Sequence, residues 1–379
     1  MSSGANSPSH TLVIPLRFLG DTLLTVPLLR MVSEVSQPDE PIDLLCSPAL
    51  APLMQACPYI RHVLPEPKKL ADSVRLLARY QRVILLRKSV TWSALAAAAG
   101  VKIRLGYDKQ RWPFGYKRWG CFLSHQGRYP NRTEPLPMAQ SHLLLLRELY
   151  PGLTPQQCAS PEALRLALWP EPQAFAALQQ KFDALALPAE CKFLSGSGAL
   201  TGARLKLAAL HLSAASHGKT IAPESFVPAI LALQEAGYTV LGLGLATERH
   251  VYEALSSRLS QPIVNLAGQT ALPEMAALFS SVQIFLGLDS GPMHMAAACN
   301  VPAIVAVFGP THHVQWGVHQ PGVYFKAVYN PLSCRPCYAK VCAHNRCKTE
   351  LAPGWITDAV HAALTHLQVS VQHPAAQQF

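Results

Sequence analysis

Short apolar runs alternate with amphipathic stretches along most of this chain, and that alternation constrains the fold more than any other feature. The first run, Leu12–Leu16, leads through a Gly-Asp turn into an amphipathic stretch from Thr22 to Val35. The first half of the sequence continues in the same way, with strands predicted at Ile42–Cys46, Arg82–Leu86 and Lys102–Leu105 and helices at Pro48–Ala56 and Lys69–Tyr80. Strands that alternate with helices predict a parallel sheet covered on both faces.

The alternation stops at a stretch rich in Gly and Ser, Cys191–Arg204, and then restarts. The second series has predicted strands at Leu207–Leu212, Thr239–Leu243, Ile263–Asn265, Ile284–Gly287 and Ala303–Phe308 and predicted helices at Pro223–Ala236, Glu248–Leu259, Leu272–Phe279 and Pro292–Cys299. A chain of 379 residues is long for a single core. The sequence therefore predicts an α/β protein of two Rossmann-like, doubly wound domains, residues 11–190 and 205–365, joined by a linker at 191–204 and facing a central cleft.

Composition agrees with a well-buried globular protein, because 50% of the residues are hydrophobic and only 14% are charged. No apolar run reaches the ~20 residues that a membrane span needs. The most apolar candidate, Trp92–Val101, is interpreted as a buried Ala-rich helix. The first ten residues lack the basic and apolar regions of a signal peptide, so a cytoplasmic location is expected.

Gly287–Ala298, with the sequence GLDSGPMHMAAA, is the segment most specific for function. It predicts a strand, a turn at Asp289–Gly291 and a helix that begins at Pro292, where the missing N–H costs nothing. Backbone N–H groups and the dipole at such a helix start form an anion site, and a glycine there lets a phosphate approach closely. In the alternative interpretation Asp289 is an N-cap and His294 a packed helix residue.

Two other polar turns follow predicted strands. The Gly-Asp turn places Asp21 at the carboxyl end of the first sheet, where a carboxylate can take a proton from an attacking hydroxyl; an N-cap role is the alternative. The turn after Leu212 contains Ser213, Ser216 and Lys219. A lysine there can neutralise charge on a departing diphosphate, although a solvent-exposed lysine is the commoner case.

Together these segments resemble glycosyltransferase family 9, the ADP-heptose:lipopolysaccharide heptosyltransferase family. That family opens with an Arg-x-x-Gly-Asp turn, present here as Arg17–Asp21. It ends with Asp-Ser/Thr-Gly-x-x-His and Val-Pro-x-hydrophobic-x-x-Phe-Gly-Pro-Thr, which occur here between Asp289 and Thr311. The first motif is similar to that of the branch that adds a third, branching heptose. The resemblance extends from Thr11 to Cys347, nearly the whole chain.

The resemblance implies a GT-B fold, with the acceptor on the N-terminal domain and ADP-heptose on the C-terminal domain. It also implies inversion at the anomeric carbon by a single displacement that requires no metal or other cofactor. Asp21 matches the general base and Lys219 the phosphate-binding lysine. With the N–H groups near Gly291, Lys219 would stabilise the departing ADP.

Other site residues are carried over from the same family motifs. Glu248 matches an acidic residue near the donor ribose, Thr270 falls near the adenine contact, and Asp289 matches the group that holds the sugar hydroxyls. The remaining substrate-binding candidates lie in the motif turns: Arg17, Gly20, Ser213, Ser216, Ser290, Gly291 and His294. Two positions depart from the family pattern, because Ile221 replaces an aromatic residue and Gly244-Leu245 replaces a Gly-Gly pair.

The net charge of +10 is concentrated in the N-terminal half, where residues 1–190 hold 21 Lys/Arg against 14 Asp/Glu. Eight basic residues and one acid, Asp108, lie between Lys102 and Arg132, interleaved with aromatic residues. Such a segment is typical of a surface that binds a phosphorylated glycolipid, a membrane or a nucleic acid, or of a solvated loop. No nucleic-acid-binding module is recognised. We therefore expect a lipopolysaccharide core or lipid A-linked acceptor, reached peripherally at the inner membrane, and no nucleic acid.

Four of the ten cysteines cluster near the C-terminus. Because no export signal is recognised, the cysteines are not expected to form a disulfide scaffold. Cys334, Cys337, Cys342 and Cys347 have the spacing x₂, x₄, x₄, which resembles a closed, tetrahedral structural zinc site. An iron–sulfur site and a loop of reduced or oxidisable thiols are the alternatives. Some members of family 9 have a similar loop, so it does not indicate a different activity.

Three other functions remain open. The Asp-Ser-Gly-Pro turn suits any nucleoside diphosphate, so another nucleotide sugar or a UDP-sugar epimerase activity is the nearest alternative. A basic nucleic-acid-binding protein is a second, since basic residues with interleaved aromatic residues can bind single-stranded nucleic acids. A family member that binds but does not transfer is a third.

Overall fold

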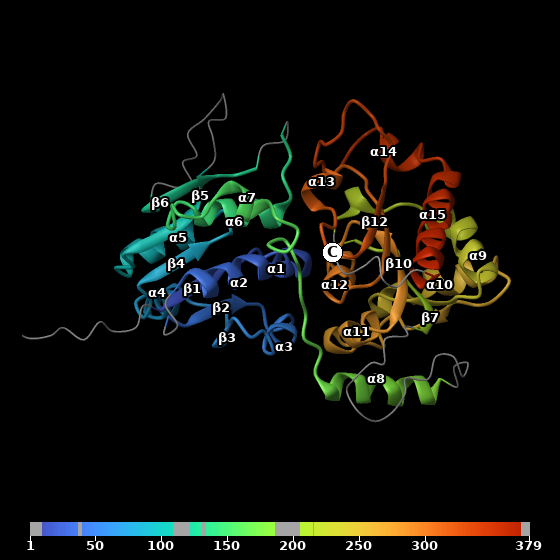
Figure 1. The fold of residues 1–379 in the computed structure, drawn as a ribbon, viewed down its shortest axis with the longest axis horizontal. Coiled ribbons are helices and arrows are strands. Elements are labelled where there is room, and N and C mark those ends of the chain that lie inside the picture. Colours follow the sequence, from blue (N-terminus) through green and yellow to red (C-terminus); the bar gives the residue numbers. More distant parts are fainter. Residues whose placement is uncertain are drawn as a thin grey trace, which may run out of the picture. The chain divides into compact units, whose positions relative to one another are not determined.

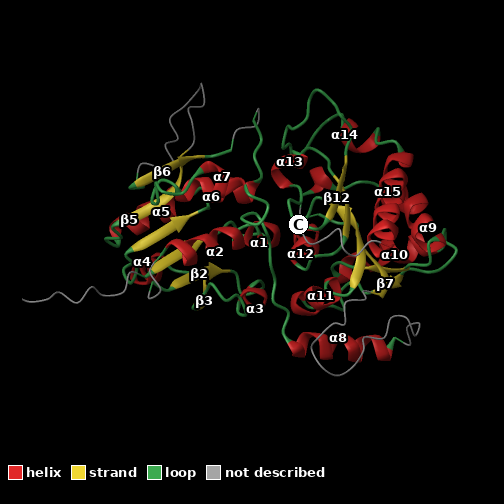
Figure 2. Cartoon of the chain, in the orientation of Figure 1, coloured by secondary structure: helices red, strands yellow, loops and turns green. Residues whose placement is uncertain are grey.

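The computed structural model describes residues 10–36, 40–108, 122–130, 134–185, 205–214 and 216–372 (Figure 1). The chain divides into two compact units, Met1–Leu166 and Ala167–Phe379. Each unit contains one six-stranded parallel sheet with helices packed on it (Figure 2). This architecture confirms the predicted α/β class with two Rossmann-like, doubly wound domains.

The first unit follows the predicted alternation of strands and helices. Its strands are β1 (Thr11–Ile14), β2 (Ile42–Cys46), β3 (His62–Pro65), β4 (Arg82–Leu85), β5 (Ile103–Asp108) and β6 (His125–Arg128), in the order β3-β2-β1-β4-β5-β6. Its helices are α1 (Leu19–Leu23), α2 (Val26–Val35), α3 (Ala51–Met54), α4 (Leu70–Leu77), α5 (Val90–Ala98), α6 (Met138–Leu146) and α7 (Pro155–Ala159).

The central strands β1 and β4 are buried on both faces, which explains why they read as continuous apolar runs. Leu12 and Leu85 point to the same face, because side chains alternate along a strand. On that face they join a core with Leu77 of α4 and with Trp92 and Ala96 of α5. The Ala-rich segment is therefore a sheet-covering helix, as predicted.

The second unit repeats the arrangement. Its strands are β7 (Leu205–His211), β8 (Thr239–Gly242), β9 (Val264–Asn265), β10 (Val282–Leu288), β11 (Ala303–Val307) and β12 (Tyr324–Val328), in the order β12-β11-β10-β7-β8-β9. Its α-helices are α8 (Pro172–Ala184), α9 (Val227–Glu235), α10 (Arg249–Ser256), α11 (Leu272–Phe279), α12 (Gly291–Ala298), α13 (His313–Trp316), α14 (Arg346–Thr349) and α15 (Pro353–Gln372). Three 3₁₀ turns, η2 (His217–Lys219), η3 (Pro223–Phe226) and η4 (Ala246–Glu248), complete the unit. Helices α9 and α15 lie on one side of these strands and α11 and α12 on the other (Figure 1).

Both sheets have the same strand order when each is numbered from its own first strand, the order typical of Rossmann folds. The chain reverses direction across the sheet between β1 and β4 in the first unit and between β7 and β10 in the second. In such sheets ligands bind beyond the carboxyl ends of the strands at this switch point. Each unit therefore has one favoured place for a site.

The structure differs from the sequence predictions at the division between the units, which lies after residue 166 rather than at 190. Helix α8 packs on α11, where Lys181 pairs with Glu274, and the backbone N–H of Leu168 donates to the carbonyl of Ala298. Both contacts join the start of the second unit to its interior. The predicted linker at 191–204 lies outside the described residues.

Other differences concern the elements themselves. The single helix predicted from Thr22 to Val35 is two helices, α1 and α2, and Pro27 occupies the first turn of the second. Edge strands β3, β6 and β12 and the helices α6, α8 and α15 were not predicted. In the described ranges, no helix combines the length and the apolar character that crossing a membrane requires.

Candidate functional site

The predicted donor-site residues all follow strands of the second sheet. Ser213, Ser216 and Lys219 come after β7, Glu248 after β8 and Thr270 after β9, whereas Asp289, Ser290, Gly291 and His294 come after β10. Since all these strands are parallel, their carboxyl ends form one edge of the sheet. The structure thus places these residues along one edge of the second sheet, and those after β7 and β10 flank its switch point.

Lys219 and Asp289 form the centre of this site. The Lys219 ammonium lies 2.8 Å from Oδ2 of Asp289 and also donates to the Asp289 backbone carbonyl at 3.2 Å. An ammonium has three N–H donors, so one remains for a ligand. The lysine is therefore held in place by two contacts and can still bind a phosphate oxygen.

Asp289 is almost completely buried, with 1% of its surface exposed. Its Oδ2 also accepts a hydrogen bond from the hydroxyl of Thr311, which follows β11. Ser290, rather than Asp289, occupies the N-cap position of α12, and no side chain caps that helix. The N-cap interpretation of Asp289 is therefore wrong, and its carboxylate serves to join the loops after β7 and β11.

Helix α12 begins at Gly291, directly after this ion pair. Ser290 Oγ does not cap the helix and donates backward to the carbonyl of Leu288. In the first turn Pro292 has no N–H, and the Met293 N–H donates to the Ser290 carbonyl. The N–H of Gly291 is therefore the first-turn donor that can face a ligand. Unpaired N–H groups and the positive end of the helix dipole attract an anion. An ammonium and a helix N-terminus thus meet at one edge, an arrangement that suits a diphosphate.

His294 lies inside α12 and is 3% exposed, and its Nδ1 has no hydrogen-bond partner among the described residues. Burial lowers the pKa of His294 to about 4 and has the same effect on His211 at the end of β7. Both imidazoles are therefore neutral near pH 7 and add no positive charge to the site. The structure agrees with the alternative interpretation of His294 as a packed helix residue.

The other donor-site candidates follow strands along the same edge of the sheet. Oε2 of Glu248 accepts a hydrogen bond from the backbone N–H of Leu245 at 2.7 Å, which closes the η4 turn. Ser213 lies 3.4 Å from Nε2 of His211, and the carbonyl of Ser216 accepts from the Lys219 N–H. Thr270 is partly exposed between β9 and α11. Their contacts with a donor stay predictions.

In the first unit, Asp21 lies in the first turn of α1, and Phe18 occupies the N-cap position. The N-cap interpretation of Asp21 is therefore wrong as well. Gly20 is buried beside it, and the exposed Arg17 donates to Oε1 of Glu66 at 2.7 Å. The motif thus places the Asp21 carboxylate and the Arg17 guanidinium four residues apart in the chain, after the carboxyl end of β1.

The cysteine-rich loop, residues 334–347, packs against the donor site. The backbone N–H groups of Cys337 and Tyr338 both donate to the carbonyl of Pro310 at 3.1 Å. A Cβ at Gly218, the neighbour of Lys219, would lie 2.5 Å from the carbonyl oxygen of Ala339, so only glycine fits there. The loop therefore packs directly against the turn that carries Lys219.

The four thiols of this loop differ in their exposure to solvent. Cys334 is exposed, Cys337 and Cys342 are partly exposed, and Cys347 is buried. In the part of the chain that the structure describes, no three His, Cys, Asp or Glu side chains are grouped so that they could hold a metal ion. Thiolates are suitable zinc ligands, and a metal bound by these four stays a prediction.

Arg335 is a residue of the site that the sequence motifs did not reveal. Its guanidinium donates to three backbone carbonyls, those of Gly309, Asn330 and Thr311, and lies 4.7 Å from the ring centre of Tyr329. It therefore holds the turn that carries Thr311, the hydrogen-bond donor to Asp289. The one feature of the sequence that pointed to Arg335 is its position between Cys334 and Cys337 of the cysteine cluster.

The predicted basic segment, Lys102–Arg132, is described only in part. Arg104 on β5 donates to the carbonyl of Phe122, and Arg128 lies on β6, at the edge of the first sheet. Residues 109–121 and 131–133, which hold five of its eight basic side chains, lie outside the described residues. Its role as a docking surface stays a prediction.

Arg335→Lys is expected to lower the free energy of unfolding by about 2 kcal/mol, because a lysine cannot reach three carbonyls in a fixed plane. Denaturant unfolding of the purified protein measures the change. Arg346→Lys in the same loop is the control, because Arg346 is exposed and its guanidinium pairs with Glu350 four residues away. Equal effects of the two substitutions would contradict the role given to Arg335.

The buried histidines predict a loss of stability in mild acid. An unfolded histidine has a pKa near 6.5, whereas those of His294 and His211 are about 4 in the folded chain. Between these values the unfolded chain binds more protons, so the free energy of unfolding falls as the pH is lowered, by roughly 1–2 kcal/mol per histidine at pH 5. His294→Asn should reduce this pH dependence, measured by denaturant unfolding from pH 7 to 5. The exposed His361, changed in the same way, should leave it unaltered.

A family model described as Glycosyltransferase family 9 (heptosyltransferase) matches residues 69–348. Over short stretches the chain is 40% identical to lipopolysaccharide heptosyltransferase 3 of Escherichia coli (strain K12), across 96 residues that make up 24% of this chain and 28% of that protein. The chain thus matches about a quarter of that relative's length. Lipopolysaccharide heptosyltransferase 2 of the same strain is 24% identical over 315 residues, 79% of this chain and 82% of that protein.

Solved structures show the same fold. E. coli ADP-heptose lps heptosyltransferase II superposes with a TM-score of 0.69 at 20% identity, over 95% of this chain and 99% of that one. E. coli heptosyltransferase WaaC, solved with ADP, superposes with a TM-score of 0.61 at 16% identity, over 93% and 99% of the two chains. The predicted GT-B fold is therefore confirmed, and the chain belongs to glycosyltransferase family 9, the heptosyltransferases.

Proposed function

We propose that this protein is an inverting glycosyltransferase that transfers heptose from ADP-heptose to the lipopolysaccharide inner core or to a related glycan. The observation that carries this proposal is the Lys219–Asp289 pair at the switch point of the second sheet, next to the start of α12. Family membership narrows the reaction to glycosyl transfer, and the pair supplies what a nucleoside diphosphate leaving group needs.

The leaving group gains its charge as the glycosidic bond breaks. The remaining N–H of Lys219 and the backbone N–H groups near Gly291 would then donate to the departing diphosphate, stabilising charge where it develops. Oδ2 of Asp289 is occupied by Lys219 and Thr311, and no described residue donates to Oδ1. That oxygen would orient a hydroxyl of the donor sugar.

Asp21 would be the general base. Its carboxylate would take the proton from the acceptor hydroxyl as that oxygen attacks the anomeric carbon from the face opposite the leaving group. The displacement forms one bond to the acceptor oxygen and breaks the bond to the diphosphate oxygen. The proposal assigns both charge stabilisation and proton transfer to side chains and backbone groups of this chain.

The acceptor is proposed to be a membrane-anchored glycolipid reached at the cytoplasmic face of the inner membrane. A net charge of +10, concentrated in the N-terminal half, would attract phosphates and carboxylates of such a surface. The local similarity to a heptosyltransferase 3 favours the branch that adds a third, branching heptose.

Donor identity is tested by the thermal stabilisation of the purified protein with ADP, ADP-heptose, UDP and UDP-N-acetylglucosamine. The adenine pair should raise the melting temperature by roughly 5–10 °C at a hundred times Kd, and Asp289→Asn should abolish most of this shift. Asp358→Asn is the matched control, because Asp358 is exposed on α15. A shift with UDP and UDP-N-acetylglucosamine alone would agree with the fold but contradict the assignment of ADP-heptose as the donor.

Asp21→Asn is expected to lower turnover by about 10²–10⁴-fold, because the amide cannot accept the acceptor proton. Release of ADP from ADP-heptose with truncated lipopolysaccharides as acceptors measures turnover, and the thermal shift with ADP should stay unchanged. Asp72→Asn, an exposed change in the same unit, should behave as wild type. If Asp21→Asn retained most of its turnover, Asp21 would not be the general base.

A further inference from the structure

The first unit has its own cluster of charged side chains at the position that Lys219 and Asp289 occupy in the second. Arg17 follows β1 and Arg87 follows β4, the two strands that flank the switch point of the first sheet. Both guanidinium groups donate to the same oxygen, Oε1 of Glu66, at 2.7 and 2.8 Å. Glu66 itself follows β3. Three loops thus meet at one carboxylate, where a Rossmann-like unit binds its ligand.

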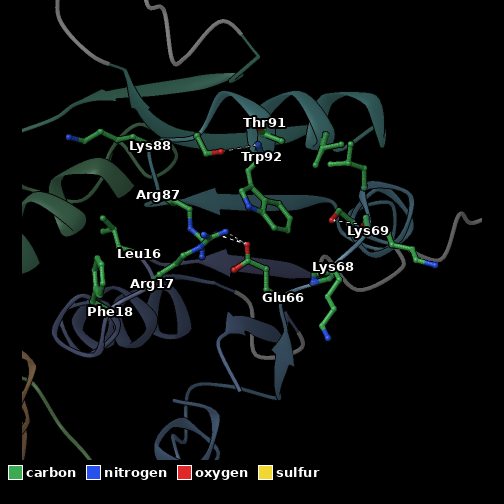
Figure 3. A pocket seen from close by; sticks show the side chains of 15 residues that line it. Leu16, Arg17, Phe18, Glu66, Lys68, Lys69, Arg87, Lys88, Thr91 and Trp92 are labelled. Atoms are coloured by element: carbon green, nitrogen blue, oxygen red, sulfur yellow. Dashed lines mark hydrogen bonds and ion pairs between the residues drawn. The ribbon is translucent and has the colours of Figure 1, made fainter. Parts of the chain in front are cut away.

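These side chains line a pocket of about 500 Å³, a size that suits a small ligand. Figure 3 shows Arg17, Arg87 and Glu66 converging, with the Trp92 ring beside them and Lys68 and Lys69 extending away. Phe18 is 65% exposed at the same site. The pocket therefore combines a central pair of guanidinium groups with the exposed ring of Phe18, which can cover the C–H face of a sugar, whereas the Trp92 ring is buried in the core.

The pocket is strongly cationic. Its lining contains five basic residues and one acid, which are Arg17, Lys68, Lys69, Arg87, Lys88 and Glu66. The Lys88 ammonium lies 3.0 Å from the ring centre of Tyr129, so it is engaged elsewhere. The excess of positive charge favours an anionic ligand.

Glu66 stays ionised in this setting. Its partial burial opposes ionisation, but the hydrogen bonds from Arg87 and Arg17 outweigh that effect and hold the pKa of Glu66 below its ordinary value. Each guanidinium has five N–H donors. Arg17 uses one of them on Glu66, and Arg87 uses one on Glu66 and its Nε on the carbonyl of Pro15. Most donors of the pair therefore remain for a second oxyanion.

We propose that this pocket binds an oxyanion carried by the acceptor sugar, a phosphate ester or a carboxylate, through Arg17 and Arg87. Glu66 is the internal counter-ion that keeps the two guanidinium groups in place before the acceptor arrives. Paired arginines match the geometry of such oxyanions better than lysines do. The proposal rests on the proposed function and names the chemical class of its acceptor.

The position of the pocket explains how this binding would serve transfer. Arg17 is four residues from Asp21, and both lie between β1 and α2 at the carboxyl edge of the first sheet. An acceptor anchored by its charged group would be oriented with a hydroxyl toward the proposed base. Such anchoring converts the attack into an intramolecular step.

Ligand-observed saturation-transfer NMR on the full chain tests the pocket with glucose 6-phosphate, glucuronate, glucose and inorganic phosphate. The two charged sugars should bind saturably and more tightly than glucose and inorganic phosphate. Arg87→Gln should weaken them by about tenfold or more, and the exposed Arg17→Gln should weaken them in the same direction. Binding of phosphate as tight as that of glucose 6-phosphate would show a site for the free ion and overturn the proposal.

Glu66→Gln separates a counter-ion from a purely structural ion pair. Removing the competing carboxylate should tighten the binding of glucose 6-phosphate by roughly two- to fivefold. Arg75→Gln is the control for lost charge, because Arg75 is exposed on α4 and does not line the pocket. Unchanged sugar binding in the Arg17, Arg87 and Glu66 variants, or no saturable binding in wild type, would overturn the proposal. Stabilisation by ADP, measured in every variant, reports separately on the donor site of the second unit.

Discussion

The ion pair between Lys219 and Asp289 is the interaction on which the rest of the second unit's site depends. It joins the loops that follow the neighbouring strands β7 and β10, and the hydroxyl of Thr311 adds the loop after β11. Arg335 then binds the carbonyl of Thr311 and so adds the cysteine-rich loop. A buried carboxylate is costly unless it is paired and hydrogen-bonded. Three loops therefore meet at the Asp289 carboxylate, and Arg335 joins the fourth to them through Thr311.

The two units have the same sheet topology but carry different charged groups at their switch points. At the switch point of the second sheet, a lysine acts as a compact positive charge beside a helix N-terminus. At that of the first, two arginines share a carboxylate, and their planar donors impose a direction on whatever binds. The first arrangement suits a diphosphate, whose charge is spread over many oxygens. The second suits a single oxyanion on a sugar, which has to be oriented as well as held.

Much of the fold could be predicted because the central strands are buried on both faces and read as apolar runs. Strand β6, with the sequence HQGR, carries no apolar side chain, and β3 is a short, partly exposed edge strand, so neither has that pattern. Asp21, Lys219 and Asp289 lie in turns after predicted strands and were found by that rule. The same rule applies to Arg87, which follows a predicted strand, but its meaning depends on Glu66 and Arg17, 21 and 70 residues away in the chain.

The cysteine-rich loop has a structural role that the spacing of its cysteines does not reveal. Its thiols suggested a metal site, yet the contacts that join it to the rest of the unit come from Arg335 and from backbone N–H groups on Pro310. Those contacts hold the turn that orients Thr311 and, through it, Asp289. Cys334 and Cys337 flank Arg335 closely in the chain. The loop and the Asp289 carboxylate are therefore linked through the Arg335 guanidinium and Thr311.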